Sequence, residues 1–150
     1  MTRRGSSRAR RRTVAAALVG AAVAAVGALP VEGAPDPIRV GPGPVAATLH
    51  NGAYTASVRI APNHGGLVLS TFTVRLRQGG EATEAAVSAR FRMPSMPMPQ
   101  LSLRLSRRGP GLYVGVGRKL TMPGVWEIRL RAAPHGGAPV EFVLIDRVGV

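Results

Sequence analysis

Three methionines, Met93, Met96 and Met98, stand close together in the segment RMPSMPMP at residues 92–99. Thioether sulfur is a soft ligand that selects Cu(I) over hard ions. Three prolines separate or follow the methionines, and proline removes a backbone donor and fixes φ. The segment is therefore neither a helix interior nor a central strand. We expect a stiff, extended connector that could turn several sulfurs toward one Cu(I) ion.

Two residues elsewhere could complete such a copper site. Met122 lies in a second turn, and His64 lies in the turn PNHGG at residues 62–66. Imidazole suits copper in either oxidation state. The predicted metal ligands are Met93, Met96 and Met98, with Met122 or His64 assisting.

Two other roles for these methionines stay open. They could fill an irregular gap at one end of the domain, because methionine packs well in such places. They could also form an exposed surface that binds a partner protein. A copper site needs three sulfurs, or two sulfurs and an imidazole, within about 2–2.5 Å of one point. A packing role instead predicts side chains that are buried and point apart.

The sequence predicts a protein without catalytic activity. It contains no cysteine, which excludes thiolate metal sites and a cysteine nucleophile. It also lacks a G-x-S-x-G motif and a glycine-rich run that would open a helix and cradle a phosphate. The acidic residues after residue 33 are scattered along the chain, so no carboxylate pair is expected.

The chain is strongly basic, with 20 Lys and Arg against 7 Asp and Glu and a formal net charge of +13. Six of the arginines lie in the first twelve residues. Without residues 1–33, 14 basic and 6 acidic residues remain, which leaves a net charge of +8. That excess could favour an anionic membrane surface or an acidic protein partner. No basic motif interleaved with aromatic residues supports a nucleic-acid partner.

The N-terminal region has the pattern of a secretory signal peptide. Residues 1–12 are rich in arginine, residues 13–29 form an apolar run, and a possible cleavage site precedes Ala34. The run of 17 residues also reaches the lower end of the range of roughly 17–25 that spans a bilayer. We therefore predict an exported, extracytoplasmic protein in which residues 1–33 are either a cleaved signal or an anchor in the cytoplasmic membrane. Residues 34–44 hold four prolines and two glycines, a composition typical of a linker.

From residue 45 onward the hydrophobic pattern has a period of two. Apolar and polar residues alternate over segments 54–61, 67–77, 87–92, 101–106, 126–131 and 140–144, with a further short strand at 113–116 and Gly/Pro turns between them. This pattern predicts an all-β fold for residues 45–150, an immunoglobulin-like β-sandwich of seven or eight short strands preceded by an N-terminal signal or anchor helix. Trp126 and Tyr113 are predicted core residues, with the tyrosine hydroxyl bonded to backbone. Gly111 and Gly124 are predicted to supply positive φ or close approach.

The last third of the chain resembles a known family. A Met/Pro connector is followed by GPGLY at residues 109–113 and by LTMPGVW at residues 120–126, with an alternating strand after it. This layout, over about residues 52–132, resembles the YtkA-like family, and the related FixH proteins share it. The resemblance implies a small extracytoplasmic immunoglobulin-like domain, often beside copper-handling or oxidase-assembly proteins, and no established catalytic residues. Two hypotheses result: a domain that binds or delivers Cu(I), or a structural or assembly module that binds another envelope or membrane protein.

Overall fold

The structure is a computed structural model that describes residues 37–63, 65–66 and 68–149. These residues form ten β-strands and no helix. Within them, no helical segment has the length and apolar character needed to cross a bilayer. The predicted signal or anchor segment, residues 1–33, lies outside the described residues, and so does His64.

The strands are separated mostly by short turns. They are β1 (Ile38–Val40), β2 (Val45–Asn51), β3 (Tyr54–Ala61), β4 (Ser70–Gln78), β5 (Glu81–Ala82), β6 (Ala85–Arg92), β7 (Leu101–Gly109), β8 (Leu112–Gly117), β9 (Gly124–Pro134) and β10 (Val140–Val148).

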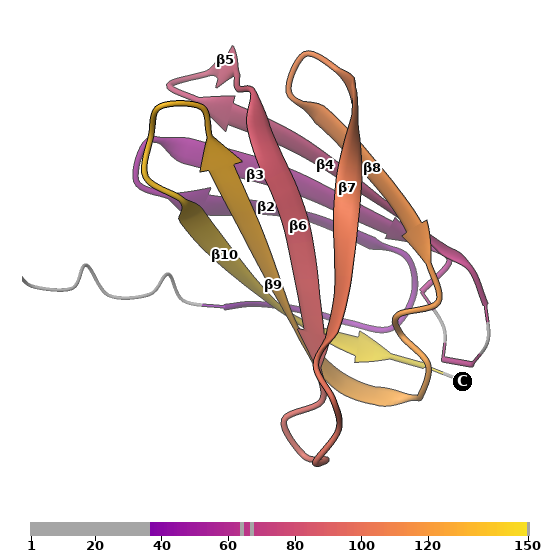
Figure 1. Cartoon of the computed structure of the whole chain (residues 1–150). Helices are drawn as coiled ribbons and strands as arrows, with labels where there is room; N and C mark the ends of the chain where they lie inside the picture. The colour runs from indigo at the N-terminus through magenta and orange to yellow at the C-terminus, as the bar shows by residue number, and fades with distance from the viewer. Residues whose placement is uncertain (1–36, 64, 67, 150) are drawn as a thin grey trace, which may run out of the picture. The chain divides into compact units, whose positions relative to one another are not determined.

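The strands form one continuous sheet in the order β1-β10-β9-β6-β7-β8-β4-β3-β2, with β5 paired to β4. All pairs are antiparallel except β1 with β10. The sheet folds over into two layers, which Figure 1 shows one behind the other. Layer A contains β1, β10, β9 and β6, and layer B contains β2, β3, β4, β5 and β8. Strand β7 belongs to both layers, because its first half pairs with β6 and its second half with β8.

The core lies between the two layers. Alternation buries one face of each long strand, as the period of two predicts. Phe72 of β4 and Phe91 of β6 meet edge to face, with ring centroids 5.1 Å apart. Trp126 is fully buried, and its indole Nε1 donates to the carbonyl of Met122 at 2.9 Å. The two layers are thus held by aromatic packing, and the outward faces are left to polar side chains.

The all-β prediction is confirmed, but the strand count and the arrangement of the sheet differ from expectation. Ten strands replace seven or eight, and the layers are joined through β7 rather than being two separate sheets. Three residues of the predicted linker, 38–40, form β1. They were missed because β1 is short, has no buried residue and pairs through its backbone with β10.

The predicted roles of Tyr113 and the two glycines are also confirmed. The Tyr113 hydroxyl accepts from the Ala85 amide at 2.7 Å and donates to the Thr83 carbonyl at 2.9 Å. Gly111 has φ +62°, and Gly124 has φ +135°, where a side chain would also collide with Met93. The tyrosine thus fixes the start of β6 to β8, and Gly124 leaves room for Met93, which follows the end of β6.

Candidate functional site

Met93 and Met122 lie at the same end of the domain. Met93 follows β6 and is buried, with 6% of its surface exposed. A Cβ placed on Gly124 would lie 2.5 Å from the Met93 methyl carbon, so the thioether packs directly against that glycine. Met122, two residues earlier, is half-buried and packs on the core. Both residues therefore contribute to packing at this end.

The other two methionines lie in different surroundings. Met96 is 44% exposed in the loop between β6 and β7, and its amide donates to the Met93 carbonyl at 3.2 Å. Met98 is half-buried and lines a surface hollow together with Arg90 and Arg92. Met93, Met98 and Met122 thus all pack on the core, whereas Met96 is exposed and is tied to Met93 through the backbone. Copper ligation by Met93, Met96, Met98, Met122 and His64 stays a prediction.

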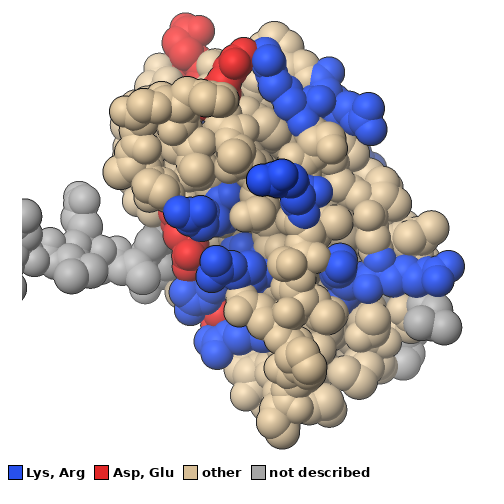
Figure 2. All heavy atoms as spheres, viewed as in Figure 1, with Lys and Arg blue, Asp and Glu red and all other residues tan. Residues whose placement is uncertain are grey.

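The outer face of layer A carries a group of arginines. Because residues of β6, β7 and β9 alternate, one set of side chains points away from the core. We call the part of this surface over β6, β9, the first half of β7 and the start of β10 the arginine face, and its charged members are Arg90, Arg92, Arg104, Arg129, Arg131, Glu127 and Glu141. Figure 2 shows blue side chains gathered over the middle of this layer, with a few red ones among them. In the sequence, its arginines are the polar positions of strands in which apolar and polar residues alternate.

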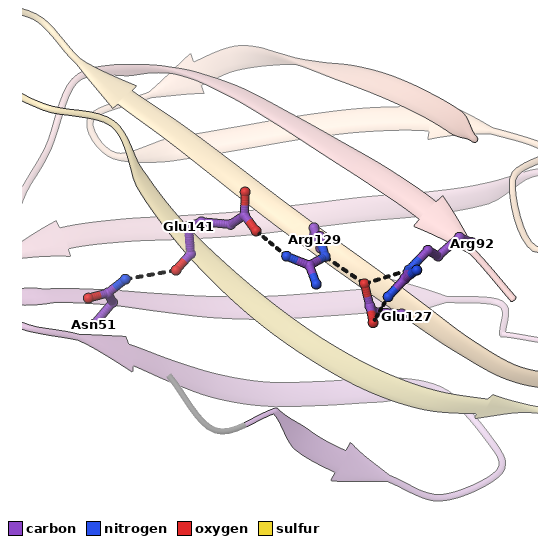
Figure 3. A network of polar contacts seen from close by, with 5 residues as sticks. All are labelled: Asn51, Arg92, Glu127, Arg129 and Glu141. Carbon is purple, nitrogen blue, oxygen red and sulfur yellow. Dashed lines mark hydrogen bonds and ion pairs between the residues drawn. The ribbon is translucent and has the colours of Figure 1, made fainter. Parts of the chain in front are cut away.

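Glu127 is the best-held charged residue of the arginine face. Arg92 donates to both of its oxygens, from Nε at 2.8 Å and from Nη2 at 2.7 Å, and Arg129 Nε donates at 2.5 Å (Figure 3). Glu127 is only 8% exposed. The hydrogen bond from Arg92 is the largest effect that lowers the pKa of Glu127, to about 2. The face therefore already contains one bidentate arginine–carboxylate ion pair, a strong form of charge-assisted hydrogen bonding.

Arg129 extends the network to β10 and β2. Its Nη1 donates to Glu141 at 2.8 Å, and the Glu141 carbonyl accepts from Asn51 Nδ2 at 2.8 Å (Figure 3). Asn51 is the last residue of β2, at the far edge of the sheet. The network thus links β6, β9 and β10 of layer A to β2, the last strand of layer B in the strand order.

Three arginines of the face have no carboxylate partner. Among the described residues, no Asp or Glu oxygen lies within ion-pair distance of Arg90, Arg104 or Arg131, and all three are exposed. Arg90 stands directly opposite Arg129 in the β6–β9 register. Like charges directly opposite each other destabilise a sheet, and the two carboxylates that pair with Arg129 offset part of this repulsion.

The three free arginines surround the middle of β6. Ser88 lies between Arg104 of β7 and Arg131 of β9 in one cross-strand row. Arg90 is two residues further along β6, on the same face. Beside this row a surface hollow of about 340 Å³ is lined by Arg90, Arg92, Met98, Gln100, Glu127, Arg129 and Glu141. The site combines a concave surface with free positive charge.

The outer face of layer B is less charged. A larger hollow there, of about 610 Å³, is lined mainly by Ala, Ser and Thr, with two arginines, Arg59 and Arg75. These arginines stand opposite Thr73 and Ser57 in the register, so no like-charge pair occurs between them. Layer B therefore supplies a natural comparison surface for tests of the arginine face.

A second polar feature lies inside the domain. Asp146 of β10 is fully buried opposite Trp126, and its Oδ2 accepts from Asn63 Nδ2 at 2.7 Å. Asn63 Nδ2 also donates to the Gly43 carbonyl at 2.9 Å. Burial is the main effect that raises the pKa of Asp146. The pair ties three loops and strands together at one end of the domain.

Comparison with known proteins identifies the family. The profile of the FixH family matches residues 47–141, which is well over half of the chain. The chain belongs to the FixH family. A search of curated proteins and a search of solved structures each find no match. FixH proteins are generally extracytoplasmic or membrane-associated.

The FixH match covers the whole candidate site. Its residues include the Met/Pro loop and every charged member of the arginine face, and it ends at Glu141. Asp146 lies beyond it. Sequence reasoning missed Asp146, although its position has a signal: it is in phase with the buried Phe142 and Leu144. The grouping of the arginines had no such signal, because it depends on the register between strands.

Proposed function

We propose that this FixH domain is an exported, non-catalytic module that binds another protein of the cell envelope through its arginine face. The face is charged, carries exposed arginines and is held together by ion pairs, and these properties suit a recognition surface. The proposal also assigns residues 1–33 to export or to anchoring at the outer face of the cytoplasmic membrane.

The observation that carries the proposal is the set of free arginines, Arg90, Arg104 and Arg131. A sheet designed only for stability would place acids or neutral residues opposite Arg129, whereas Arg90 stands there. Arginine presents a planar fork of donors that suits carboxylate recognition at interfaces. The electrostatic cost within the domain is offset when a partner supplies negative charge.

The packing of the methionines supports the same proposal. Met93 is buried against Gly124, and Met122 packs on the core. Both side chains thus have a structural role that requires no metal. The Met/Pro loop forms one side of the hollow, because Met98 and Gln100 are among the residues that line the hollow.

Site-specific photocrosslinking of the full chain in its host cell tests the proposal. A photoreactive residue replaces Ser102 on the arginine face or, as a matched control, Ser57 on layer B; both serines are exposed. We expect a discrete crosslinked envelope protein from position 102 and none from position 57. Equal adducts from both positions, or none from position 102, would overturn the proposal.

Cu(I) binding is a second candidate function. The observation that favours it is the backbone hydrogen bond from Met96 to Met93, which turns the loop back and leaves the predicted ligand Met96 exposed. Delivery would proceed by exchange of ligands with a partner that carries its own soft donors.

A competition titration of the full chain with Cu(I) against a chromophoric chelator tests this candidate. The variant Met93→Leu/Met96→Leu/Met98→Leu conserves side-chain volume, a change that usually costs less than about 1.5 kcal/mol per site. Stoichiometric binding that the variant loses would support the copper site. A folded wild-type chain that leaves the chelator fully loaded would exclude it.

A further inference from the structure

We propose that the arginine face recognises an acidic, extended peptide segment of the partner, whose carboxylates bind Arg90, Arg104 and Arg131. This inference rests on the proposed function and names the chemistry of the partner. It assigns Arg90, which lines the hollow beside Met98, as the contact of one acidic side chain.

The geometry of the sheet gives the spacing of the carboxylates. Neighbouring strands lie about 4.8 Å apart, so Arg104 and Arg131, on either side of β6, are roughly 10 Å apart at the backbone. Arg90 lies two residues along β6 from Ser88, a step of about 6.8 Å, so its backbone is about 8 Å from that of Arg104 and of Arg131. The three arginines thus form a triangle whose sides are longer than the step of about 6.8 Å between alternate side chains of an extended peptide. An extended acidic segment reaches all three because the long arginine side chains span a difference of about 1–3 Å.

Glu127 shows how the face holds a carboxylate. Its two oxygens receive three donors from Arg92 and Arg129, on strands β6 and β9. Arg90 belongs to the same strand as Arg92, and Arg131 to the same strand as Arg129. Arg90 and Arg131 therefore stand on the same two strands, and on the same face, as the two arginines that already bind the Glu127 carboxylate.

The charges on the face favour a peptide over a lipid bilayer. Glu127 and Glu141 lie among the arginines and would repel a uniformly anionic membrane surface. Arg90, the one proposed contact that lines the hollow, stands beside Met98 on a concave surface that a flat bilayer would not fill. A segment with spaced acids can place each carboxylate on an arginine and avoid the two glutamates.

Fluorescence anisotropy with a labelled hexaglutamate peptide tests the inference, with a hexaglutamine peptide as the uncharged probe. The full chain is used in a neutral detergent. We expect the hexaglutamate peptide to bind and the hexaglutamine peptide not to bind. We also expect affinity to fall as salt rises, because exposed charges are screened.

Two double variants locate the binding. Arg104→Gln/Arg131→Gln removes two free arginines from the face, and Arg59→Gln/Arg75→Gln removes the same charge from layer B. We expect the first to weaken hexaglutamate binding about tenfold or more and the second less than about threefold. Equal losses in both variants would show non-specific attraction and would overturn the inference.

A vesicle arm separates the peptide from a membrane. Vesicles of phosphatidylglycerol and phosphatidylcholine are added to the same variants. Vesicle binding that depends on Arg104 and Arg131, without peptide binding, would overturn the inference in favour of a lipid surface. A crosslink from position 102 without hexaglutamate binding would overturn the inference that the partner segment is acidic, and the proposed function would stand. Absence of that crosslink would sink the proposed function itself.

Discussion

Asp146 and Asn63 form a buried polar pair whose hydrogen bonding is incomplete. Asp146 Oδ1 and Asn63 Oδ1 are both buried, and neither has a hydrogen-bond partner among the described residues. Both atoms are acceptors when Asp146 is ionised, and an unsatisfied buried acceptor costs about 1–3 kcal/mol. A proton on Asp146 adds the missing donor. We therefore expect Asp146 to be protonated in the native state above the pH at which exposed aspartate ionises.

The variant Asp146→Asn tests this expectation. Because burial raises the pKa of Asp146, the stabilising proton is present at low pH and is lost as pH rises through the native pKa. Asparagine keeps a donor and an acceptor without charge. In urea unfolding, the variant should match wild type near pH 3 and equal or exceed its stability at pH 7. A loss of more than about 1 kcal/mol at pH 7 would contradict the assignment.

Glu127 should give the opposite pH dependence. Its pKa is lowered from the ordinary value of 4.5 to about 2, first by the hydrogen bond from Arg92. Its contribution is present above about pH 4.5 and is lost as pH falls toward 2. Glu127→Gln should therefore cost on the order of 1–2 kcal/mol at pH 7, because both arginines remain partly solvated, and almost nothing near pH 2. A cost that does not change with pH would refute this account.

At the scale of elements, the long strands were predictable and the edge strands were not. The strand from Leu101 was predicted because Leu101, Leu103 and Leu105 alternate with polar residues. Strand β2 has only two large apolar residues, Val45 and Leu49, among alanines and polar residues, so its period is weak. Strands at the edge of a sheet pair through backbone groups that leave little trace in the sequence.

The turn between β7 and β8 gives a test at this scale. Gly111 has φ +62°, and a Cβ there would lie 2.6 Å from the Leu76 carbonyl oxygen. Gly79 has a similar φ of +57° with nothing within 4 Å. Gly79→Ala should thus cost only the left-handed strain of about 1–2 kcal/mol, and Gly111→Ala clearly more, measured by urea unfolding. Equal costs would show that the β7–β8 turn is less closely packed than described.

At the scale of the whole molecule, the sequence predicted the all-β class and the related family, whereas the arginine face required the three-dimensional register. Alternation shows that Arg90, Arg104 and Arg131 point outward, but not that β6 lies between β7 and β9. Only that order brings the three arginines around Ser88.

Glu127 also competes with any acidic ligand for the arginines of the face. Glu127→Gln releases Arg92 and Arg129, so it should increase hexaglutamate affinity severalfold in the anisotropy assay. Glu81→Gln, at an exposed residue of β5, makes the same change in net charge away from the face. An equal increase in both variants would mean that only net charge matters.

The most direct test of the central claim is a nuclear magnetic resonance titration of the ¹⁵N-labelled full chain with the hexaglutamate peptide, followed through the arginine side-chain Nε–H signals. If the arginine face is the binding surface, the signals of Arg90, Arg104 and Arg131 shift in a saturable way, while those of Arg59 and Arg75 on layer B stay in place. Larger or equal shifts on layer B would contradict the claim.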